Sequence, residues 1–249
     1  SQSMKTIDLS TTIAAGPEIE IEYQDHAAGA EQIKAWLDVP ANLLRDGEGW
    51  AVERFTNFGT HSSTHIDAPW HYNSQIEGKR AQTIDELPLE WFFNDAVLFE
   101  MRHKQDGDPV TVEEIESELD RIQYELKPLD IILIRNGQDE FYGQRDYIHR
   151  GCGVTAEATR WLYDKGIRVM GIDAWGWDAP LRMEAKDAVE HGGREIFWAA
   201  HQAGIAYSQI ERLVNLAPLP TSGFKVACFP LKIKDGSGAP ARVVALLDE

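Results

Sequence analysis

The sequence predicts an α/β fold, a single domain in which a mixed β-sheet is flanked by helices. Two observations predict this class. Continuous apolar runs occur at 130–135 and 168–173, as expected for strands buried on both faces. Between them, Thr155 caps a predicted helix over 156–165, and the order strand, helix, strand is typical of parallel neighbours joined by a right-handed crossover. With 43% hydrophobic residues among 249, the chain can bury a sizeable core.

The first part of the chain is expected to be mostly irregular over 16–50, because glycine and proline recur there. Short elements are predicted as a strand at 5–10, a helical piece at 31–37 and a strand at 52–55. A long ordered loop is often a lid or a wall of a binding site. Trp36 and Trp50 either belong to such a wall or cover the core.

The remainder alternates strands and helices. A capping box from Thr111 to Glu114 opens a helix with apolar residues from Val112 to Ile122. Further elements are predicted as a helical turn at 85–91, a strand at 96–101, a short helix at 194–203, and strands at 225–233 and 241–247 joined by a glycine-rich turn at 235–240. We expect one domain over 4–249, with residues 1–3 as an expression scar before Met4.

Composition excludes several classes of protein. The net charge of −17, without clustered lysine or arginine, argues against a nucleic-acid partner. No apolar run reaches the roughly 20 residues that span a bilayer, so we expect no membrane partner and a cytoplasmic location. Cys152 and Cys228 form no CxxC pair, which argues against a disulfide framework and against a thiolate zinc site.

The strongest chemical signal is the stretch 60–71, with the pattern HxxxHxDxPxH. It places three of the eight histidines and one aspartate within eleven residues. Imidazole and carboxylate are ligands of first-row metals, and such groups with an open coordination position form catalytic sites. The stretch therefore predicts a metal-dependent hydrolase.

The local geometry supports shared coordination. Pro69 prevents one continuous helix, so the segment is expected to be extended or irregular. In an extended chain, His61, His65 and Asp67 point to the same side. A divalent ion there would acidify a water molecule and polarise a carbonyl group. His71, beyond Pro69, is placed to carry a proton without being a ligand, and zinc and manganese both suit these donors.

This stretch resembles the HxGTHxDxPxH signature of the metal-dependent cyclase family, whose members include bacterial kynurenine formamidase and isatin hydrolase. Ser63 stands where the family usually has glycine. The runs 171–178 and 211–216 are also similar to family segments, so the resemblance extends over 4–249. It implies a fold of the swivelling β/α/β type.

The resemblance also implies roles for particular residues. The metal ligands would be His61, His65, Asp67, His201 and Glu211. They would hold one or two divalent ions, Zn²⁺ or Mn²⁺, with Asp67 able to bridge two. His71 would be the catalytic acid and base. The spacing from His201 to Glu211 is shorter than in the formamidase branch, which points to another branch. The family further implies a homodimer or homotetramer.

The implied reaction is hydrolysis of a small aromatic amide, with arylformamidase chemistry in tryptophan catabolism (N-formylkynurenine to kynurenine and formate) as the leading example. One alternative is an isatin hydrolase-like opening of a cyclic amide. Another is a non-catalytic, metal-stabilised binding protein, which the presence of His71 disfavours. Trp70, Trp175 and Trp177 either line an aromatic pocket or pack in the core, and Asp173 is either a ligand or a structural carboxylate.

Overall fold

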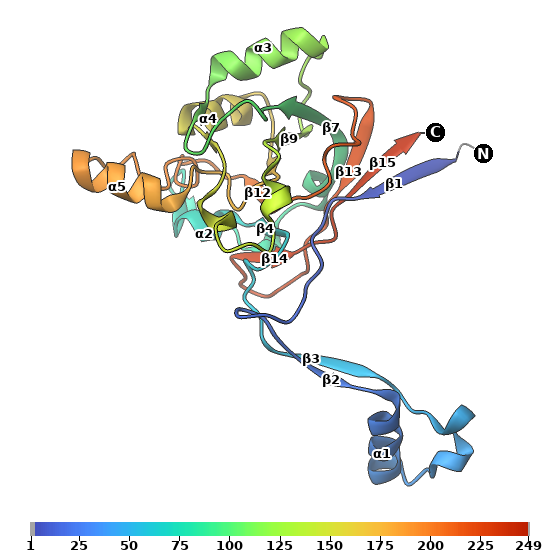
Figure 1. Cartoon of the computed structure of the whole chain (residues 1–249). Helices are drawn as coiled ribbons and strands as arrows, with labels where there is room; N and C mark the ends of the chain where they lie inside the picture. Colours follow the sequence, from blue (N-terminus) through green and yellow to red (C-terminus); the bar gives the residue numbers. More distant parts are fainter. Residues whose placement is uncertain (1–2, 249) are drawn as a thin grey trace. The chain divides into compact units, whose positions relative to one another are not determined.

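The computed structural model describes residues 3–248, which form two compact units (Figure 1). Unit 1 comprises the chain up to Thr11 and from Ser63 onward, and unit 2 is Thr12–Ser62. Two of the three residues in the predicted expression scar, 1 and 2, lie outside the described part, as does residue 249. The boundaries of a single domain over 4–249 stay a prediction.

Unit 1 is built on a mixed sheet of nine strands in the described part of the chain. In spatial order they are β1 (Met4–Asp8), β15 (Val244–Asp248), β13 (Phe224–Ala227), β7 (Phe93–Glu100), β9 (Ile131–Arg135), β11 (Val169–Ile172), β12 (Ser208–Glu211), β4 (His65–Asp67) and β14 (Gly238–Pro240). The central run from β7 to β12 is parallel, and the outer pairs are antiparallel. The predicted mixed sheet is confirmed.

The sheet buries both faces, which explains the continuous apolar runs. On β9, Ile132 and Ile134 belong to one core cluster, together with residues of α3 (Val112–Ile122) and α4 (Ala156–Asp164). Ile131 and Leu133 belong to a second cluster on the opposite face. Figure 1 shows α3 and α4 on the same side of the sheet. The flanking helices predicted from the sequence are therefore present.

The second core cluster joins strands from distant places in the sheet. It contains Ile7 of β1, Leu133 of β9 and Ile66 of β4, although β1 and β4 lie near opposite ends of the strand order. A sheet can bring such strands into one cluster only by curling. As a result, every residue of β4 is buried.

Local signals placed most elements correctly. Thr111 Oγ1 accepts a hydrogen bond from the Glu114 amide at 3.3 Å, and Glu114 Oε1 accepts one from the Thr111 amide at 3.2 Å. These two bonds form the predicted capping box of α3. Thr155 caps α4 by accepting from the Ala158 amide at 3.0 Å. The strand pair near the C-terminus is confirmed by the antiparallel pairing of β13 with β15, although β13 ends at Ala227 and not at 233 as predicted.

The predicted helix at 194–203 is wrong. These residues form turns, and the helix of this region is α5 (Leu181–His191), which is absent from the predicted elements. Its half-buried residues Leu181, Ala185 and Ala188 recur at helical spacing, but none of its residues is fully buried. In the turns, side-chain carboxylates from outside the segment accept hydrogen bonds from backbone amides that a helix would use internally, namely those of Trp198, Ala200 and His201.

The glycine-rich segment at 235–240 is more than a turn. Its last residues form β14, which pairs with β4 across the registers Gly238 to Asp67 and Pro240 to His65. Pairing with a strand that far away in sequence leaves no local signal. This strand covers the outer edge of β4.

Unit 2 is more regular than predicted. It contains α1 (His26–Leu37) and an antiparallel pair formed by β2 (Glu20–Gln24) and β3 (Val52–Asn57). The helix begins earlier than the expected piece at 31–37, because Asp25 caps it by accepting from the Ala28 amide at 2.9 Å. A Cβ at Gly29 would lie 1.9 Å from the Trp50 carbonyl oxygen, so glycine permits the close packing of α1 on the segment before β3.

Short elements complete the described chain. They are α2 (Pro69–Tyr72), β5 (Gln75–Ile76), β6 (Lys79–Arg80), β8 (Pro109–Val110), β10 (Gly153–Val154), and the 3₁₀ turns η1 (Ala41–Leu43), η2 (Arg45–Gly47), η3 (Ile84–Glu86), η4 (Leu89–Phe92), η5 (Gln138–Phe141) and η6 (Tyr147–His149). No helix within residues 3–248 has both the length and the apolar character that crossing a membrane requires.

Ser63, which stands where the family usually has glycine, has a left-handed backbone with φ of 59°. Its hydroxyl contacts Thr11 Oγ1. The neighbouring Thr64 amide donates to the same Thr11 oxygen at 3.0 Å. Side-chain hydrogen bonds therefore hold a conformation that glycine would adopt without strain.

We expect Ser63→Gly to be more stable than Ser63→Ala by about 1 kcal/mol, because both variants lack the hydroxyl and only alanine keeps the steric cost of the left-handed backbone. The free energies of unfolding of the two variants in urea measure this difference. Equal stabilities would show that the backbone at this position is not strained.

Candidate metal centre

The pairing of β12 with β4 brings distant residues to the motif. In this antiparallel pair, Glu211 lies directly opposite His65. His65 and Asp67 are alternate residues of β4, so their side chains share one face of the sheet. Strand pairing therefore places the Glu211 carboxylate beside two residues that come nearly 150 positions earlier in the printed sequence.

Two imidazoles and two carboxylates converge in this place. His65 Nε2 lies 3.2 Å from Asp67 Oδ1 and 3.3 Å from Glu211 Oε1. His201 Nε2 lies 3.7 Å from Asp67 Oδ2 and 3.5 Å from Glu211 Oε2. All four residues are buried, with at most 6% of any one exposed. Each carboxylate thus faces both imidazoles.

Each imidazole is oriented by a hydrogen bond at Nδ1, the nitrogen that does not face the carboxylates. His65 Nδ1 lies 2.8 Å from the Ser63 carbonyl oxygen, which can only accept, so Nδ1 carries the proton. His201 Nδ1 lies 2.6 Å from Asp178 Oδ2. In a neutral ring this leaves the lone pair on Nε2, directed at the carboxylates. Lone pairs and carboxylates repel one another, so this arrangement calls for a cation between them.

The donor set fits a divalent metal ion. Histidine nitrogen and carboxylate oxygen bind zinc at roughly 2.1 Å, which separates neighbouring ligand atoms of a tetrahedral ion by about 3.4 Å. The two contacts of His65, at 3.2 and 3.3 Å, match this spacing. The two contacts of His201, at 3.7 and 3.5 Å, are made to the other oxygen of each carboxylate. Manganese accepts the same kinds of ligand, so the distances do not choose between the two metals.

Glu211 reaches this position because a glycine lies beside it. The Trp177 amide donates a hydrogen bond to Glu211 Oε2 at 3.0 Å. A Cβ added at Gly176 would lie 2.9 Å from the same oxygen, which is closer than a carbon and an oxygen can approach without displacement. The backbone of the segment after β11 therefore contacts the Glu211 carboxylate directly, through the Trp177 amide and beside Gly176.

The carboxylates control the protonation of the imidazoles in the metal-free protein. Burial alone would lower the pKa of His65, but Asp67 and Glu211 together raise the pKa to about 9. Burial and the charge of Asp67 would raise the pKa of Glu211, whereas His201 and His65 lower it to about 2. Without an ion, protons on the imidazoles neutralise the carboxylates, so protons and metal compete for the same positions.

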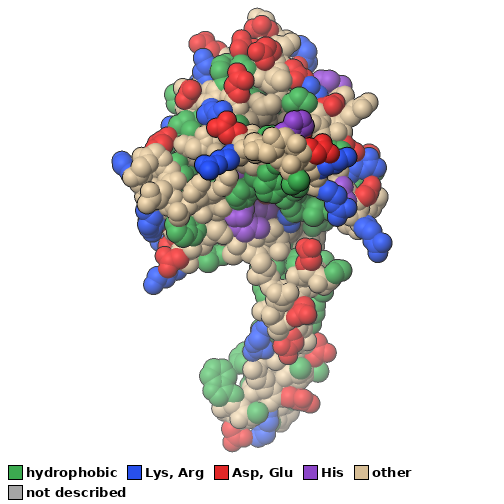
Figure 2. All heavy atoms as spheres, turned by 90° about the vertical axis from the view of Figure 1, so that its left-hand side faces the viewer, with side chains coloured by type: hydrophobic (Ala, Val, Ile, Leu, Met, Phe, Trp, Pro, Cys, Tyr) green, Lys and Arg blue, Asp and Glu red, His purple; other side chains and the backbone are tan. Residues whose placement is uncertain are grey.

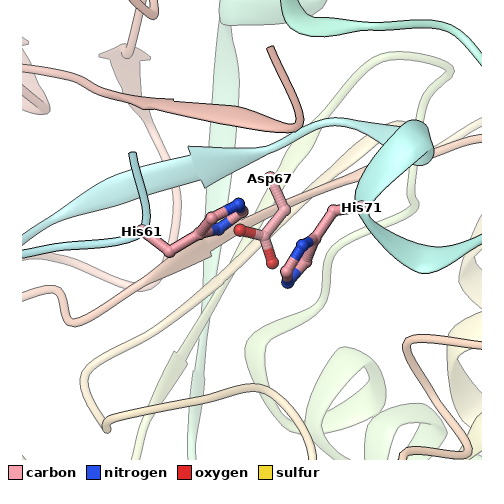
Figure 3. Close-up of side chains that lie close together, drawn as sticks. All are labelled: His61, Asp67 and His71. Carbon is pink, nitrogen blue, oxygen red and sulfur yellow. The ribbon is translucent and has the colours of Figure 1, made fainter. Parts of the chain in front are cut away.

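The other part of the motif forms a second group around the same aspartate. Ligand atoms of His61, Asp67 and His71 lie within 4.8 Å of one another. Figure 3 shows the two imidazoles on either side of the Asp67 carboxylate. His71 lies on α2. Pro69 is the first residue of this short helix, which follows strand β4. Asp67 is common to both groups.

Five of the six residues singled out in the sequence therefore fall into two groups that share Asp67, namely His65, Asp67 and Glu211, and His61, Asp67 and His71. The sixth, His201, contacts Asp67 and Glu211. The short spacing from His201 to Glu211 does not separate them, because the turn that contains His201 and strand β12 both reach the centre. Their individual roles as ligands, and that of His71 in proton transfer, stay predictions.

Sequence reasoning overlooked the residues behind His201. Asp178 accepts from the Ala200 amide at 3.1 Å and from the His201 amide at 2.9 Å, in addition to its contact with the imidazole. Burial and the neighbouring Asp178 raise the pKa of Glu184 to about 9, so this carboxyl keeps its proton at neutral pH and can donate it to Asp178. The one available signal for Asp178 was a carboxylate soon after a buried strand.

Other candidates have structural positions. Asp173 accepts from the amides of Asn136 at 2.6 Å and Gly137 at 2.9 Å, and so ties the end of β9 to that of β11. Trp177 is fully buried and its indole donates to Thr159 Oγ1 at 3.0 Å. Trp70, next to His71, remains 39% exposed.

The visible surface in Figure 2 has histidine side chains next to a patch of hydrophobic side chains. His61 and His71 are half-buried, whereas the imidazoles of His65 and His201 are fully enclosed. A molecule approaching from solvent can therefore meet the first pair of imidazoles more easily than the second.

Comparison with known proteins identifies the family. The family model described as "Putative cyclase" matches residues 7–179, which is more than half of the chain. The chain belongs to this cyclase family.

Named relatives share about a quarter of their residues with the chain. A kynurenine formamidase of Bacillus cytotoxicus is 26% identical over 187 residues, covering 74% of this chain and 75% of that protein. An isatin hydrolase of Roseibium aggregatum is 26% identical over 208 residues, covering 76% of this chain and 72% of that protein. Both relatives are similar over most of their length.

Solved structures share the fold. The structure of isatin hydrolase A from Labrenzia aggregata bound to benzyl benzoate superposes with a TM-score of 0.73 at 24% identity, covering 99% of this chain and 94% of that one. A structure described as a novel cyclase gives a TM-score of 0.70 at 17% identity, with 98% and 89% covered. The predicted fold of the cyclase family is confirmed.

We expect the thermal stability of the metal-free protein to fall as the pH rises from 6.5 to about 9. The pKa of His65 is raised from 6.5 to about 9 on folding, so its proton contributes stability that is fully present below pH 6.5 and lost as the pH rises through 9. Metal-loaded protein should lack this loss, because the ion neutralises the carboxylates. Melting temperatures of chelator-treated and metal-loaded protein across this range measure both slopes, and equal slopes would contradict a metal site here.

Proposed function

We propose that this chain is a metal-dependent hydrolase of a small amide, with His61, His65, Asp67, His201 and Glu211 as metal ligands and His71 as the acid and base. The observation that carries the proposal is the enclosed set of two imidazoles and two carboxylates. Each imidazole Nε2 lies within 3.7 Å of an oxygen of both carboxylates. The names of the relatives, kynurenine formamidase and isatin hydrolase, support hydrolysis of a carbon–nitrogen bond.

A divalent ion, Zn²⁺ or Mn²⁺, supplies Lewis-acid polarisation of a carbonyl group and acidifies a water molecule when bound. Asp67 lies near His61 as well as near His65 and Glu211, which supports the proposal that these residues would hold one or two ions, with His71 beside them as the acid and base. Asp178 and Ser63 keep the second nitrogens of His201 and His65 occupied, so that each ring presents Nε2 to the centre.

His71 carries the proton in this proposal. It accepts a proton from the attacking water as the new carbon–oxygen bond forms, and returns it to the amide nitrogen as the carbon–nitrogen bond breaks. The products are an amine and a carboxylic acid, which releases its own proton to solvent as it ionises. The half-buried position of His71 supports this role, because its ring can meet a substrate that enters from solvent.

The substrate that we propose is an aromatic amide. Hydrophobic side chains lie beside surface histidines in Figure 2, and Trp70 next to His71 is partly exposed. N-Formylkynurenine is the leading candidate. An isatin-like cyclic amide is the second, supported by the isatin hydrolase that is 26% identical over 208 residues. The cytoplasmic location expected from the sequence stays a prediction.

We expect His71→Ala to lower kcat/KM by roughly 10²- to 10⁴-fold while retaining bound metal, because it removes the proton carrier and no proposed ligand. His65→Ala should lose metal and activity together. Hydrolysis of N-formylkynurenine and of isatin, with metal content by mass spectrometry, measures both effects.

His103→Ala is a suitable control for these variants, since its side chain is 66% exposed and lies at a different place on the fold. Full activity in His71→Ala would contradict the role in proton transfer. Loss of one ion in that variant would make His71 a ligand instead.

We also propose that the chain forms a homodimer or homotetramer through unit 2. Within this unit only Gly29, Ala30 and Ile33 are buried. Large apolar side chains remain exposed at Tyr23, Trp36, Leu37, Leu43, Trp50 and Phe55. Exposed apolar surface of this kind marks sites of association between proteins.

We expect light scattering to give two or four times the chain mass of 28.0 kDa, and the double variant Trp36→Ser with Leu43→Ser to shift the protein toward the monomer. These side chains are 72% and 71% exposed, so the change removes apolar surface without opening the core. Val189→Ser, at a residue 85% exposed on α5, is the matched control. A monomeric wild type would refute the assembly.

A further inference from the structure

Trp198 has a backbone conformation that is costly for a bulky residue. Its φ is 59°, in the left-handed region that large side chains seldom adopt. Such conformations persist only where their surroundings hold them, and they cluster at functional sites. The Trp198 amide donates to Glu184 Oε1 at 3.2 Å, and its carbonyl accepts from the Gln202 amide at 2.9 Å. Hydrogen bonds thus hold the residue at both of its peptide groups.

The indole of Trp198 contacts two histidines of the proposed site, His201 and His71. It stacks on the His201 ring with centroids 4.5 Å apart and planes at 17°. It also meets the His71 ring edge to face, with centroids 5.3 Å apart and planes at 84°. The two imidazoles are themselves 6.1 Å apart. One aromatic side chain therefore defines the planes of both rings.

A second aromatic residue, Tyr72, also contacts the two rings. Tyr72 lies 5.5 Å from the His201 ring centroid at 82°, and 6.0 Å from that of His71 at 60°. Tyr72 is itself fixed, since its hydroxyl oxygen accepts a hydrogen bond from the Gln209 amide at 3.1 Å. Both imidazoles therefore contact two aromatic side chains, the buried Tyr72 and the indole of Trp198.

The turn that carries Trp198 is tied to the rest of the fold by two neighbouring carboxyls. Glu184 of α5 holds the Trp198 amide, and Asp178 holds the amides of Ala200 and His201. Glu184 and Asp178 also hydrogen-bond to one another. This explains why the segment is not a helix, and it gives the exposed α5 a direct connection to the centre.

Ordinary core packing does not account for Trp198. The residue is half-buried and belongs to neither of the two core clusters of the described chain. Trp161, by comparison, is also half-buried and packs against the edge of the first cluster. A tryptophan that only packs against the core does not require a strained backbone.

We infer that Trp198 is a positioning residue, whose indole sets the orientation of the His71 imidazole relative to His201. This inference rests on the proposed function, because His71 is there the group that moves the proton. A ring that packs against two aromatic neighbours keeps its reactive nitrogen in one direction. A misplacement of about 1 Å can reduce a rate 10²-fold.

The test compares Trp198→Leu, Trp198→Phe and the control Trp161→Leu in metal-loaded protein. For hydrolysis of N-formylkynurenine or isatin, we expect Trp198→Leu to lower kcat by roughly 10- to 100-fold, with KM changed much less. The pH profile of kcat should shift, because the surroundings of His71 change. Trp198→Phe should recover part of the rate, since it keeps a ring. Metal content and melting temperature of Trp198→Leu should match those of Trp161→Leu.

An unchanged kcat and pH profile in Trp198→Leu would overturn the inference. A loss of rate in proportion to a loss of bound metal would also overturn it, because Trp198 would then act on metal binding and not on the orientation of His71.

A second measurement does not depend on catalysis. The imidazole protons of His71, assigned by their absence in His71→Ala, should move in the NMR spectrum of Trp198→Leu when the ring current of the indole is removed. Unmoved signals would overturn the inference. If wild-type protein hydrolyses neither amide, the proposed function fails, and the NMR result still decides whether Trp198 positions His71.

Discussion

Two buried imidazoles that face two buried carboxylates between β4 and β12 are the interaction on which the rest of this structure depends. Burying two carboxylates is expensive unless positive charge accompanies them. Here the charge is supplied either by protons on His65 and His201 or by a metal ion between the four groups. Because each ring has its other nitrogen already occupied, neither can turn away. The site is therefore arranged before any ion binds.

The curled sheet makes this arrangement possible. The antiparallel register of β12 on β4 places Glu211 opposite His65, and β14 covers the other edge of β4. Gly176 leaves room for the Glu211 carboxylate. On the far side, Asp178 shapes the turn that delivers His201. Rigid strands hold one half of the centre, and a turn held by hydrogen bonds supplies the other half.

Elements with local signals were predictable from the sequence. The capping box at Thr111 and the cap at Thr155 mark helix starts that the structure confirms, and the apolar runs of β9 and β11 reflect burial on both faces. The errors occur where non-local contacts override local preference. The segment at 194–203 forms turns because carboxylates from elsewhere accept its amide hydrogens. Helix α5 gives only a weak local signal, because its half-buried side carries small or polar residues beside Leu181 and none of its residues is fully buried.

The sequence by itself determined the chemistry of the motif, because the spacing of His65, Asp67 and His71 within one short segment controls which side chains can meet. It also determined the family, through the same residues. Only the tertiary structure decided that Glu211 and His201 meet Asp67, that Asp173 is structural, and that Trp198 packs on both His71 and His201. The physical reason is that strand register and turn shape depend on contacts between residues far apart in sequence, which leave no periodic or local pattern to read.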